Sequence, residues 1–156
     1  MFYLRFAMIR PYQQSDADRL ITIWLESSAI AHSFIDYGYW ERNAPAMRSV
    51  YLPTAKTFVW INETDHQIAG FISMAGSTVA ALFVAPGYQQ SGIGSALIRF
   101  AKQQHDTLNL YVYCLNRKAF SFYRKHGFEV IETNTDPGTG EDQYHMVFRR
   151  TESSAF

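Results

Sequence analysis

The amino-acid sequence predicts a mixed α/β fold, in which a central sheet of about seven strands is flanked by four helices. The expected order is β-α-α-β-β-β-α-β-α-β-β. Three observations predict this fold. Apolar residues recur at spacings typical of helices in some segments and of strands in others. Residues 78–84 are apolar on both faces, as in a central strand. A loop with two glycines then joins this strand to an amphipathic helix.

The N-terminal half is predicted to hold two helices and three strands. The expected elements are a strand over 8–12, helices over 16–31 and 41–52, and strands over 57–61 and 68–74. Ser15 and Asp18 resemble a capping box that starts the first helix. Pro45 is expected to interrupt the second helix or to delay its start.

The C-terminal half is predicted to alternate strands and helices. The expected elements are strands over 78–84, 108–113, 128–132 and 143–149, and helices over 92–106 and 116–126. Gly127 is a typical residue to end the second of these helices, and residues 134–142 are expected to form a loop. No linker is visible, so residues 8–149 are predicted to form a single domain, with 1–7 and 150–156 as terminal extensions.

Composition excludes several classes of function. Fourteen basic and fourteen acidic side chains give a formal charge of zero, which argues against a nucleic-acid partner. No apolar run is long enough for a membrane span. Cys114 is the only cysteine, so no intramolecular disulfide can form, and a reducing, cytoplasmic location is expected. The five histidines are scattered, and no metal site is predicted.

The loop that contains Gly92 and Gly94 is the strongest candidate site. If a helix begins at Gly92 or just after it, its first N–H groups have no partner within the helix. Together with the helix dipole they favour a phosphate or pyrophosphate. An ATP loop is excluded because no Lys-Ser or Lys-Thr pair follows the second glycine. A dinucleotide site is also excluded, because the loop has one glycine fewer than the dinucleotide-binding fingerprint requires. The alternative is an ordinary glycine turn.

Two motifs make residues 8–149 resemble the GNAT superfamily of acyl-CoA-dependent N-acetyltransferases. The first motif, at the fourth strand-to-helix junction, is Gln89-x-x-Gly92-x-Gly94. The second, after the fifth strand, is Asn116-x-x-Ala119-x-x-Phe122-Tyr123-x-x-x-Gly127-Phe128. Two further segments are similar to small bacterial members, some of which are protein-lysine acetyltransferases: Trp24-Leu25-Glu26-Ser27 and His32-Ser33-Phe34-Ile35.

The resemblance implies a GNAT-like sheet, acetyl-CoA as cosubstrate and no metal. The residues implied to contact acetyl-CoA are Leu82, Phe83, Val84, Gln89, Gln90, Ser91, Gly92, Ile93, Gly94, Ser95, Asn116 and Tyr123. Backbone groups of the glycine loop would hold the pyrophosphate. The pantetheine arm would pair with residues 82–84 at a bulge where the sheet splays. For Asn116, a purely structural helix cap is the alternative.

Tyr123 is implied to be the general acid. Attack by an amine on the thioester expels the CoA thiolate, which must be protonated. A phenol with a pKa near 10 still carries its proton at pH 7 and can supply it. The alternative is that Tyr123 is an aromatic core residue, as expected for Phe120 and Phe122.

The general base is not assigned by the resemblance. Many family members carry a glutamate on or near the fourth strand, but residues 78–84 contain no carboxylate. The candidates are Glu26, His32 and His145, or a water relay through Tyr111 or Tyr113. His32 is taken as base or acceptor-site residue because histidine titrates near neutrality. A surface histidine is the alternative.

The expected function is transfer of acetyl from acetyl-CoA to a primary amine by direct attack in a ternary complex. The acceptor is a protein lysine, a protein N-terminus or a small amine; the sequence does not decide between them. It also does not decide between a monomer and a homodimer. The aromatic residues of 34–40 are either an acceptor-pocket wall or packing. The alternatives are a catalytically silent acyl-CoA-binding regulatory module and a structural domain without cofactor.

Overall fold

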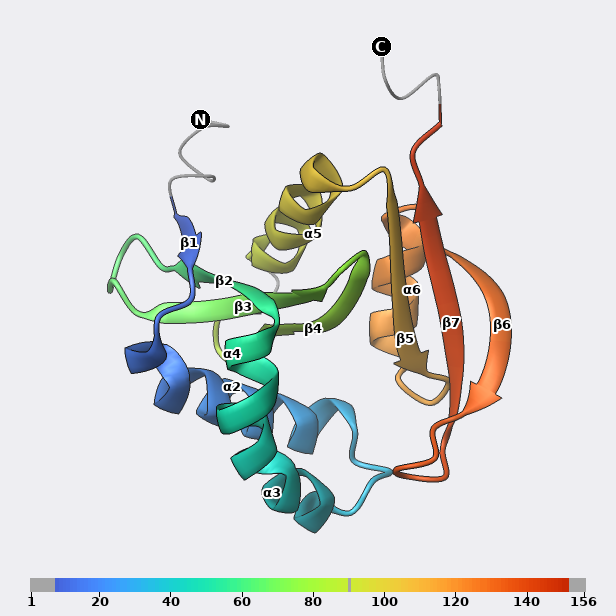
Figure 1. Ribbon diagram of the computed structural model, residues 1–156, viewed down its shortest axis with the longest axis horizontal. Helices are drawn as coiled ribbons and strands as arrows, with labels where there is room; N and C mark the ends of the chain where they lie inside the picture. The colour runs from blue at the N-terminus through green and yellow to red at the C-terminus, as the bar shows by residue number, and fades with distance from the viewer. Residues whose placement is uncertain (1–7, 90, 152–156) are drawn as a thin grey trace.

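A mixed sheet of seven strands runs through the molecule in the order β1-β2-β3-β4-β5-β7-β6 (Figure 1). The computed structural model describes residues 8–89 and 91–151. The strands are β1 (Ile9–Pro11), β2 (Lys56–Ile61), β3 (Ile68–Ala75), β4 (Thr78–Val84), β5 (Thr107–Tyr113), β6 (Glu129–Thr135) and β7 (Asp142–Arg149). Only β4 and β5 are parallel neighbours; the other neighbouring pairs are antiparallel. The predicted mixed α/β fold with seven strands is confirmed, and its elements follow one another along the chain as predicted.

Helices cover both faces of this sheet. They are α2 (Ala17–Ala31), α3 (Tyr37–Ala46), α4 (Leu52–Thr54), α5 (Ile93–Gln104) and α6 (Arg117–Lys125), with a 3-10 turn η1 (Gln14–Asp16) and a π-helical stretch η2 (Met47–Tyr51). In Figure 1, α2 and α5 lie on opposite sides of β3. One buried cluster joins α2 and α3 to the sheet around Leu20 and Phe71. Another joins α5 to the opposite face around Leu97 and Met146.

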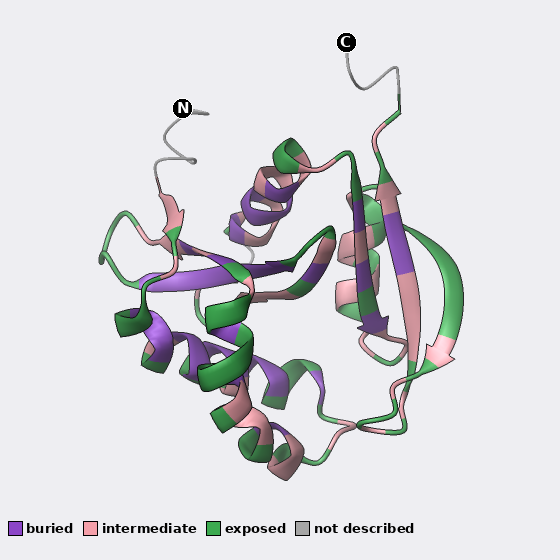
Figure 2. Cartoon of the chain, viewed as in Figure 1, coloured by how far each residue is buried: buried purple, intermediate pink, exposed green. Residues whose placement is uncertain are grey.

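The strand β3 is the centre of both clusters. Seven of its eight residues are buried, and Figure 2 shows it as an almost continuous buried strip. Its residues Phe71 and Ile72 are fully buried and point to opposite faces, because side chains alternate along a strand. Burial of each such side chain stabilises the fold by about 1.5–3 kcal/mol. β3 therefore fixes α2 and α5 relative to one another.

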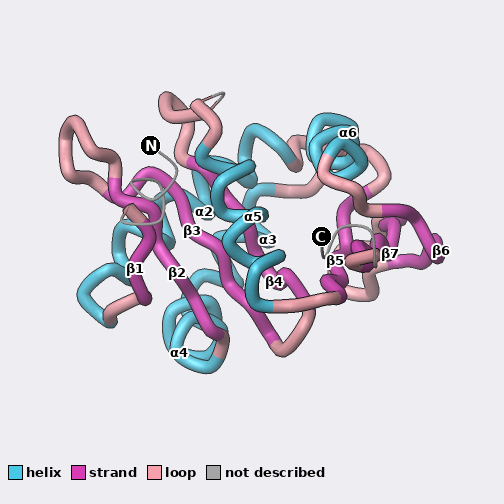
Figure 3. Tube along the Cα trace, turned by 90° about the horizontal axis from the view of Figure 1, so that it is seen from above, coloured by secondary structure: helices cyan, strands magenta, loops and turns pink. Residues whose placement is uncertain are grey.

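The sheet splits between β4 and β5. These two strands pair only where Thr78 meets Asn109, at the start of β4. Beyond that point they diverge, and Figure 3 shows β5, β7 and β6 as a group apart from β1–β4. On its other edge, β4 carries a bulge: Ser73 pairs with Ala81 and Met74 with Val79, which leaves one extra residue in β4 between them. The splay opens a wedge in the middle of the sheet.

The start of α2 differs from the expected capping box. Ser15 and Asp18 do not form it; Asp16 instead accepts a hydrogen bond from the Gln13 N–H at 2.8 Å. Asp16 is buried and forms an ion pair with Arg10 at 2.8 Å, which ties η1 to β1. Asp18 forms an ion pair with Arg48. The prediction was wrong because a tertiary partner, Arg10, decides which carboxylate turns inward.

The second helical segment is longer than expected. Helix α3 begins at Tyr37 rather than Glu41, because Trp40 in its first turn is buried against α2. Pro45 does not end the helix. It lacks an N–H and cannot complete the regular ladder, and the π-helical turn η2 follows directly after α3.

The last hairpin also differs from expectation. β6 extends to Thr135, whereas the sequence predicts its end at Glu132. The loop is correspondingly shorter, because Thr135 pairs with Asp142 at the start of β7. The end of β6 is polar and mostly exposed, so it lacks the apolar alternation by which a strand is recognised.

Candidate active site

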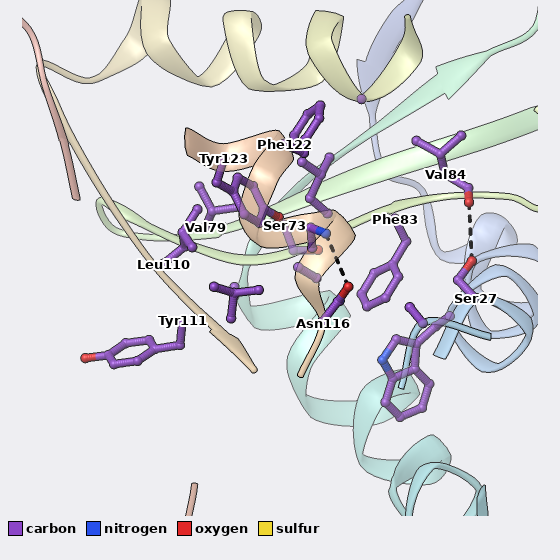
Figure 4. A pocket seen from close by; sticks show the side chains of 18 of the residues that line it. Ser27, Ser73, Val79, Phe83, Val84, Leu110, Tyr111, Asn116, Phe122 and Tyr123 are labelled. Carbon is purple, nitrogen blue, oxygen red and sulfur yellow. Dashed lines mark hydrogen bonds between the residues drawn. The ribbon is translucent and has the colours of Figure 1, made fainter. Parts of the chain in front are cut away.

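The wedge between β4 and β5 opens into a cleft of about 1960 Å³. It is lined by α2, η2, α5, α6 and the strands β3, β4 and β5 (Figure 4). The predicted residues that line it are His32, Leu82, Phe83, Val84, Gln89, Gly92, Ile93, Gly94, Ser95, Asn116 and Tyr123. Ser91 lies in the glycine loop, where its hydroxyl donates to the Tyr88 carbonyl. Gln90 lies outside the described residues. The fold thus brings both sequence motifs to one cleft.

The start of α5 has the features expected of an anion site. Gly92 is the N-cap residue in the left-handed conformation, with φ of 85°. The first helical bond runs from the Ala96 N–H to the Gly92 carbonyl at 3.0 Å. The N–H groups of Ile93, Gly94 and Ser95 therefore precede the helical ladder and are available to a ligand. They favour a phosphate or pyrophosphate at this end of the cleft.

Replacement of Gly92 by alanine is expected to weaken both folding and donor binding. A left-handed conformation costs a residue with a Cβ atom about 1–2 kcal/mol, so the loop would shift or strain. We expect a higher KM for acetyl-CoA and a free energy of unfolding lower by about 1 kcal/mol. Urea denaturation and steady-state kinetics measure the two effects. The matched control is Gly140→Ala, which has φ of 78° but does not line the cleft. A similar rise in KM in both variants would contradict the assigned role.

His126 lies next to the glycine loop, and the sequence identified it only as a helix end. It is the C-cap residue of α6, and its Nε2 lies 2.9 Å from the Ser95 Oγ at the start of α5. The Lys102 ammonium donates to the His126 carbonyl at 2.5 Å. These contacts join the end of α6 to the first turn of α5. The C-cap pattern indicated where α6 ends, but not what its last side chain would contact.

Tyr123 lies in α6 across the wedge from β4, close to Val79 and Leu110 (Figure 4). Its ring packs edge-on against Phe128 and Phe122. Burial raises the pKa of the Tyr123 hydroxyl above its usual value. The hydroxyl therefore keeps its proton at neutral pH while it lines the cleft, as a proton donor must.

Asn116 joins α6 to the far side of the cleft. As N-cap of α6, its Oδ1 accepts the Ala119 N–H at 3.2 Å, which is the cap predicted from the sequence. This bond fixes the amide, so Nδ2 faces the His32 Nε2 at 3.2 Å. Because Nδ2 can only donate, the His32 Nε2 accepts, and the ring proton sits on Nδ1. The helix cap thus sets the tautomer of His32.

His32 is a buried residue in an aromatic wall rather than a surface histidine. It is 9% exposed, stacks on Trp40 with centroids 5.2 Å apart, and has Tyr113 edge-on at 5.2 Å. Burial lowers its pKa to about 4. A base with that pKa has little driving force to take a proton from an ammonium group. The position of His32 favours the acceptor-site role over the role of base.

The other base candidates are less well placed. Glu26 is exposed and does not line the cleft. His145 contacts the Asn109 Oδ1 at 2.9 Å and also lies outside the lining. Tyr111 and Tyr113 do line the cleft. Burial and the Asp136 carboxylate, which accepts from the Tyr113 hydroxyl at 2.6 Å, raise the pKa of Tyr113.

The described part of the chain holds neither a candidate metal-binding cluster nor a membrane-spanning helix. Within 8–89 and 91–151, no three or more His, Cys, Asp or Glu side chains come together in a way that could hold a metal ion. Over the same ranges, no helix combines the length and the apolar character that a membrane crossing requires.

Comparison with known proteins identifies the family. A profile of the acetyltransferase (GNAT) domain matches residues 55–130. The peptidyl-lysine N-acetyltransferase YiaC of Escherichia coli strain K12 is 40% identical over 126 residues, which cover 80% of this chain and 85% of YiaC. The peptidyl-lysine N-acetyltransferase YjaB of the same strain is 32% identical over 122 residues, which cover 78% of this chain and 82% of YjaB.

A solved structure shows the same fold. The solution structure of apo-form YjaB from Escherichia coli superposes with a TM-score of 0.80 and 29% identity, over 92% of this chain and 97% of that one. The likeness therefore extends over the whole sheet and the cleft, beyond the segment that the domain profile matches. The chain belongs to the GNAT family of acetyl-CoA-dependent N-acetyltransferases, and acetyl-CoA is its cosubstrate.

Proposed function

We propose that this enzyme transfers the acetyl group of acetyl-CoA directly to the side-chain amine of a protein lysine, in a ternary complex. The single observation that carries direct transfer is the position of Tyr123: a hydroxyl that keeps its proton lines the cleft opposite the splayed edge of β4. The relatives YiaC and YjaB are named peptidyl-lysine N-acetyltransferases, which supports lysine as acceptor. A cytoplasmic location, where acetyl-CoA and protein lysines meet, is part of the proposal.

On the donor side, we assign the pyrophosphate to the N–H groups of Ile93, Gly94 and Ser95. The pantetheine amides would pair with the edge of β4 at 82–84 that β5 leaves unpaired. A backbone N–H on that edge can polarise the thioester carbonyl as charge develops on its oxygen. These are backbone contacts, which explains why Leu82, Phe83 and Val84 can be apolar.

In the transfer step, the neutral amine attacks the carbonyl carbon and a new C–N bond forms. The C–S bond breaks, and the departing thiolate takes the proton of the Tyr123 hydroxyl, which solvent then restores. The amine nitrogen loses its remaining extra proton to water. Of the described residues that line the cleft, none is Asp or Glu, and its cationic side chains lower the pKa of an incoming ammonium. Free amine is thereby supplied without a dedicated carboxylate base.

The test is CoA release from acetyl-CoA with matched peptides, one with a free lysine and a blocked N-terminus, the other with a free N-terminus and no lysine. We expect release with the first peptide and, by mass spectrometry, an acetyl group on its lysine. Transfer only to the second peptide would contradict a lysine acceptor. If acetyl-CoA raises the melting temperature but neither peptides nor small amines release CoA, the silent binding module is correct. Ligand at 100 times Kd stabilises a fold by about 2.7 kcal/mol, which a melting scan detects.

A further inference from the structure

The exposed apolar side chains of the described residues gather at the cleft. Eight large hydrophobic residues are exposed among the described residues, and five of them line the cleft. These five are Ile30, Val50, Tyr51, Tyr111 and Leu115, each at least 50% exposed. The other three lie elsewhere, on α3 and β6. Apolar surface concentrated at the mouth of a cleft is typical of a surface that a partner covers.

These five side chains come from both sides of the wedge. Ile30 lies near the end of α2, and Val50 and Tyr51 lie in η2, on one side. Tyr111 in β5 and Leu115 just after it lie on the other side, opposite the α2–α4 segment (Figure 1). Figure 4 shows the Tyr111 side chain directed away from Tyr123. This mouth therefore opens on the α2–α3 face of the sheet, away from the start of α5 where the pyrophosphate is proposed to bind.

The charged side chains that line the described cleft are all positive. Its charged lining residues among those described are Lys56, Arg117, Lys118 and Lys125. Within the described ranges, no carboxylate lies within 4.0 Å of any of these four groups. No Asp or Glu is among the described residues that line the cleft. A second cationic group on the acceptor would find no carboxylate to pair with and would be repelled.

From this combination we infer that the acceptor lysine is recognised within a protein segment whose neighbouring side chains are apolar and acidic. The inference rests on the proposed function and specifies its substrate class. Apolar neighbours of the lysine would cover the exposed side chains at the mouth. Acidic neighbours would complement Lys56 and, at the start of α6, Arg117 and Lys118. Polyamines, and lysines that lie among other lysines and arginines, would be poor acceptors.

The first test compares three peptides that carry the same single acceptor lysine and a blocked N-terminus. Its neighbours are leucine and aspartate in one, alanine in the second, and arginine in the third. We expect kcat/KM to fall in that order, with about a tenfold difference between the first and third. Equal values, or the reverse order, would overturn the inference while leaving the lysine acetyltransferase activity established. If no peptide is acetylated, the proposed function fails instead.

The second test asks whether the mouth causes the preference. Ile30→Ser and Tyr51→Ser should each lower kcat/KM for the leucine-aspartate peptide roughly threefold, because apolar contact is lost. Both should lower kcat/KM for the alanine peptide less than for the leucine-aspartate peptide, and should leave KM for acetyl-CoA unchanged. Ile131→Ser is the matched control, since Ile131 is 51% exposed on β6 and does not line the cleft. Equal losses on both peptides, or an equal loss in the control, would overturn the assignment of the mouth.

Discussion

Tyr123→Phe is expected to lower kcat for acetyl transfer at least about 100-fold, the usual contribution of a positioned general acid. The substitution removes only the hydroxyl. The ring still packs against Phe122 and Phe128, so the fold and the walls of the cleft should persist. KM for acetyl-CoA should change little, because the lost proton acts on the departing thiolate and not on the bound thioester. Steady-state kinetics with a lysine peptide measure both constants.

The control for this variant is Tyr144→Phe. Tyr144 packs on Phe120 in the same cluster but does not line the cleft, so kcat should be unchanged. A second check uses pH. Burial raises the pKa of Tyr123, so the acid stays protonated, and kcat of the wild type should not fall up to pH 9. A Tyr123→Phe enzyme with wild-type kcat would show that the thiolate takes its proton from another source.

Sequence alone predicts the seven strands, the order of the elements along the chain and both motifs of the donor site. A buried strand such as β3 carries a short apolar run. Local backbone requirements also leave a residue signature: Gly92 needs positive φ, and Asn116 caps a helix. Both features depend on near neighbours in the chain. This is why the glycine loop and the start of α6 were predicted at the correct residues.

Contacts between distant segments could not be predicted in this way. His32 and Asn116 are separated by 84 positions, and no spacing rule links them. The contact between Ser95 and His126 spans 31 positions and depends on how α5 and α6 pack. The start of α3 at Tyr37 depends on the burial of Trp40 against α2. The aromatic wall around His32 is built from such contacts, so the sequence left His32 as a base, an acceptor-site residue or a surface histidine.

The burial of His32 also predicts how stability depends on pH. Its pKa falls from 6.5 to about 4 in the folded state, whereas the unfolded chain has the ordinary value. Between these values the unfolded state binds more protons, so the free energy of unfolding decreases as pH falls from about 6.5 toward 4. Above pH 6.5 this contribution is complete. The loss from this one group approaches about 3 kcal/mol at the low end of the window. Urea denaturation at several pH values measures it.

His32→Gln isolates this contribution. Glutamine does not titrate, and its side-chain oxygen can still accept a hydrogen bond from the Asn116 amide. The variant should therefore lose most of the decrease between pH 6.5 and 4 that the wild type shows. The control His105→Gln removes a histidine that is less buried and should keep that decrease.

In the wild type, protonation would also place an N–H of His32 against the Asn116 NH2 at the start of α6. The start of α6 should therefore loosen together with His32, and amide hydrogen exchange in α6 should accelerate over the same pH range in the wild type but not in His32→Gln. Parallel stability profiles for wild type and His32→Gln would show that His32 is not held neutral by its surroundings.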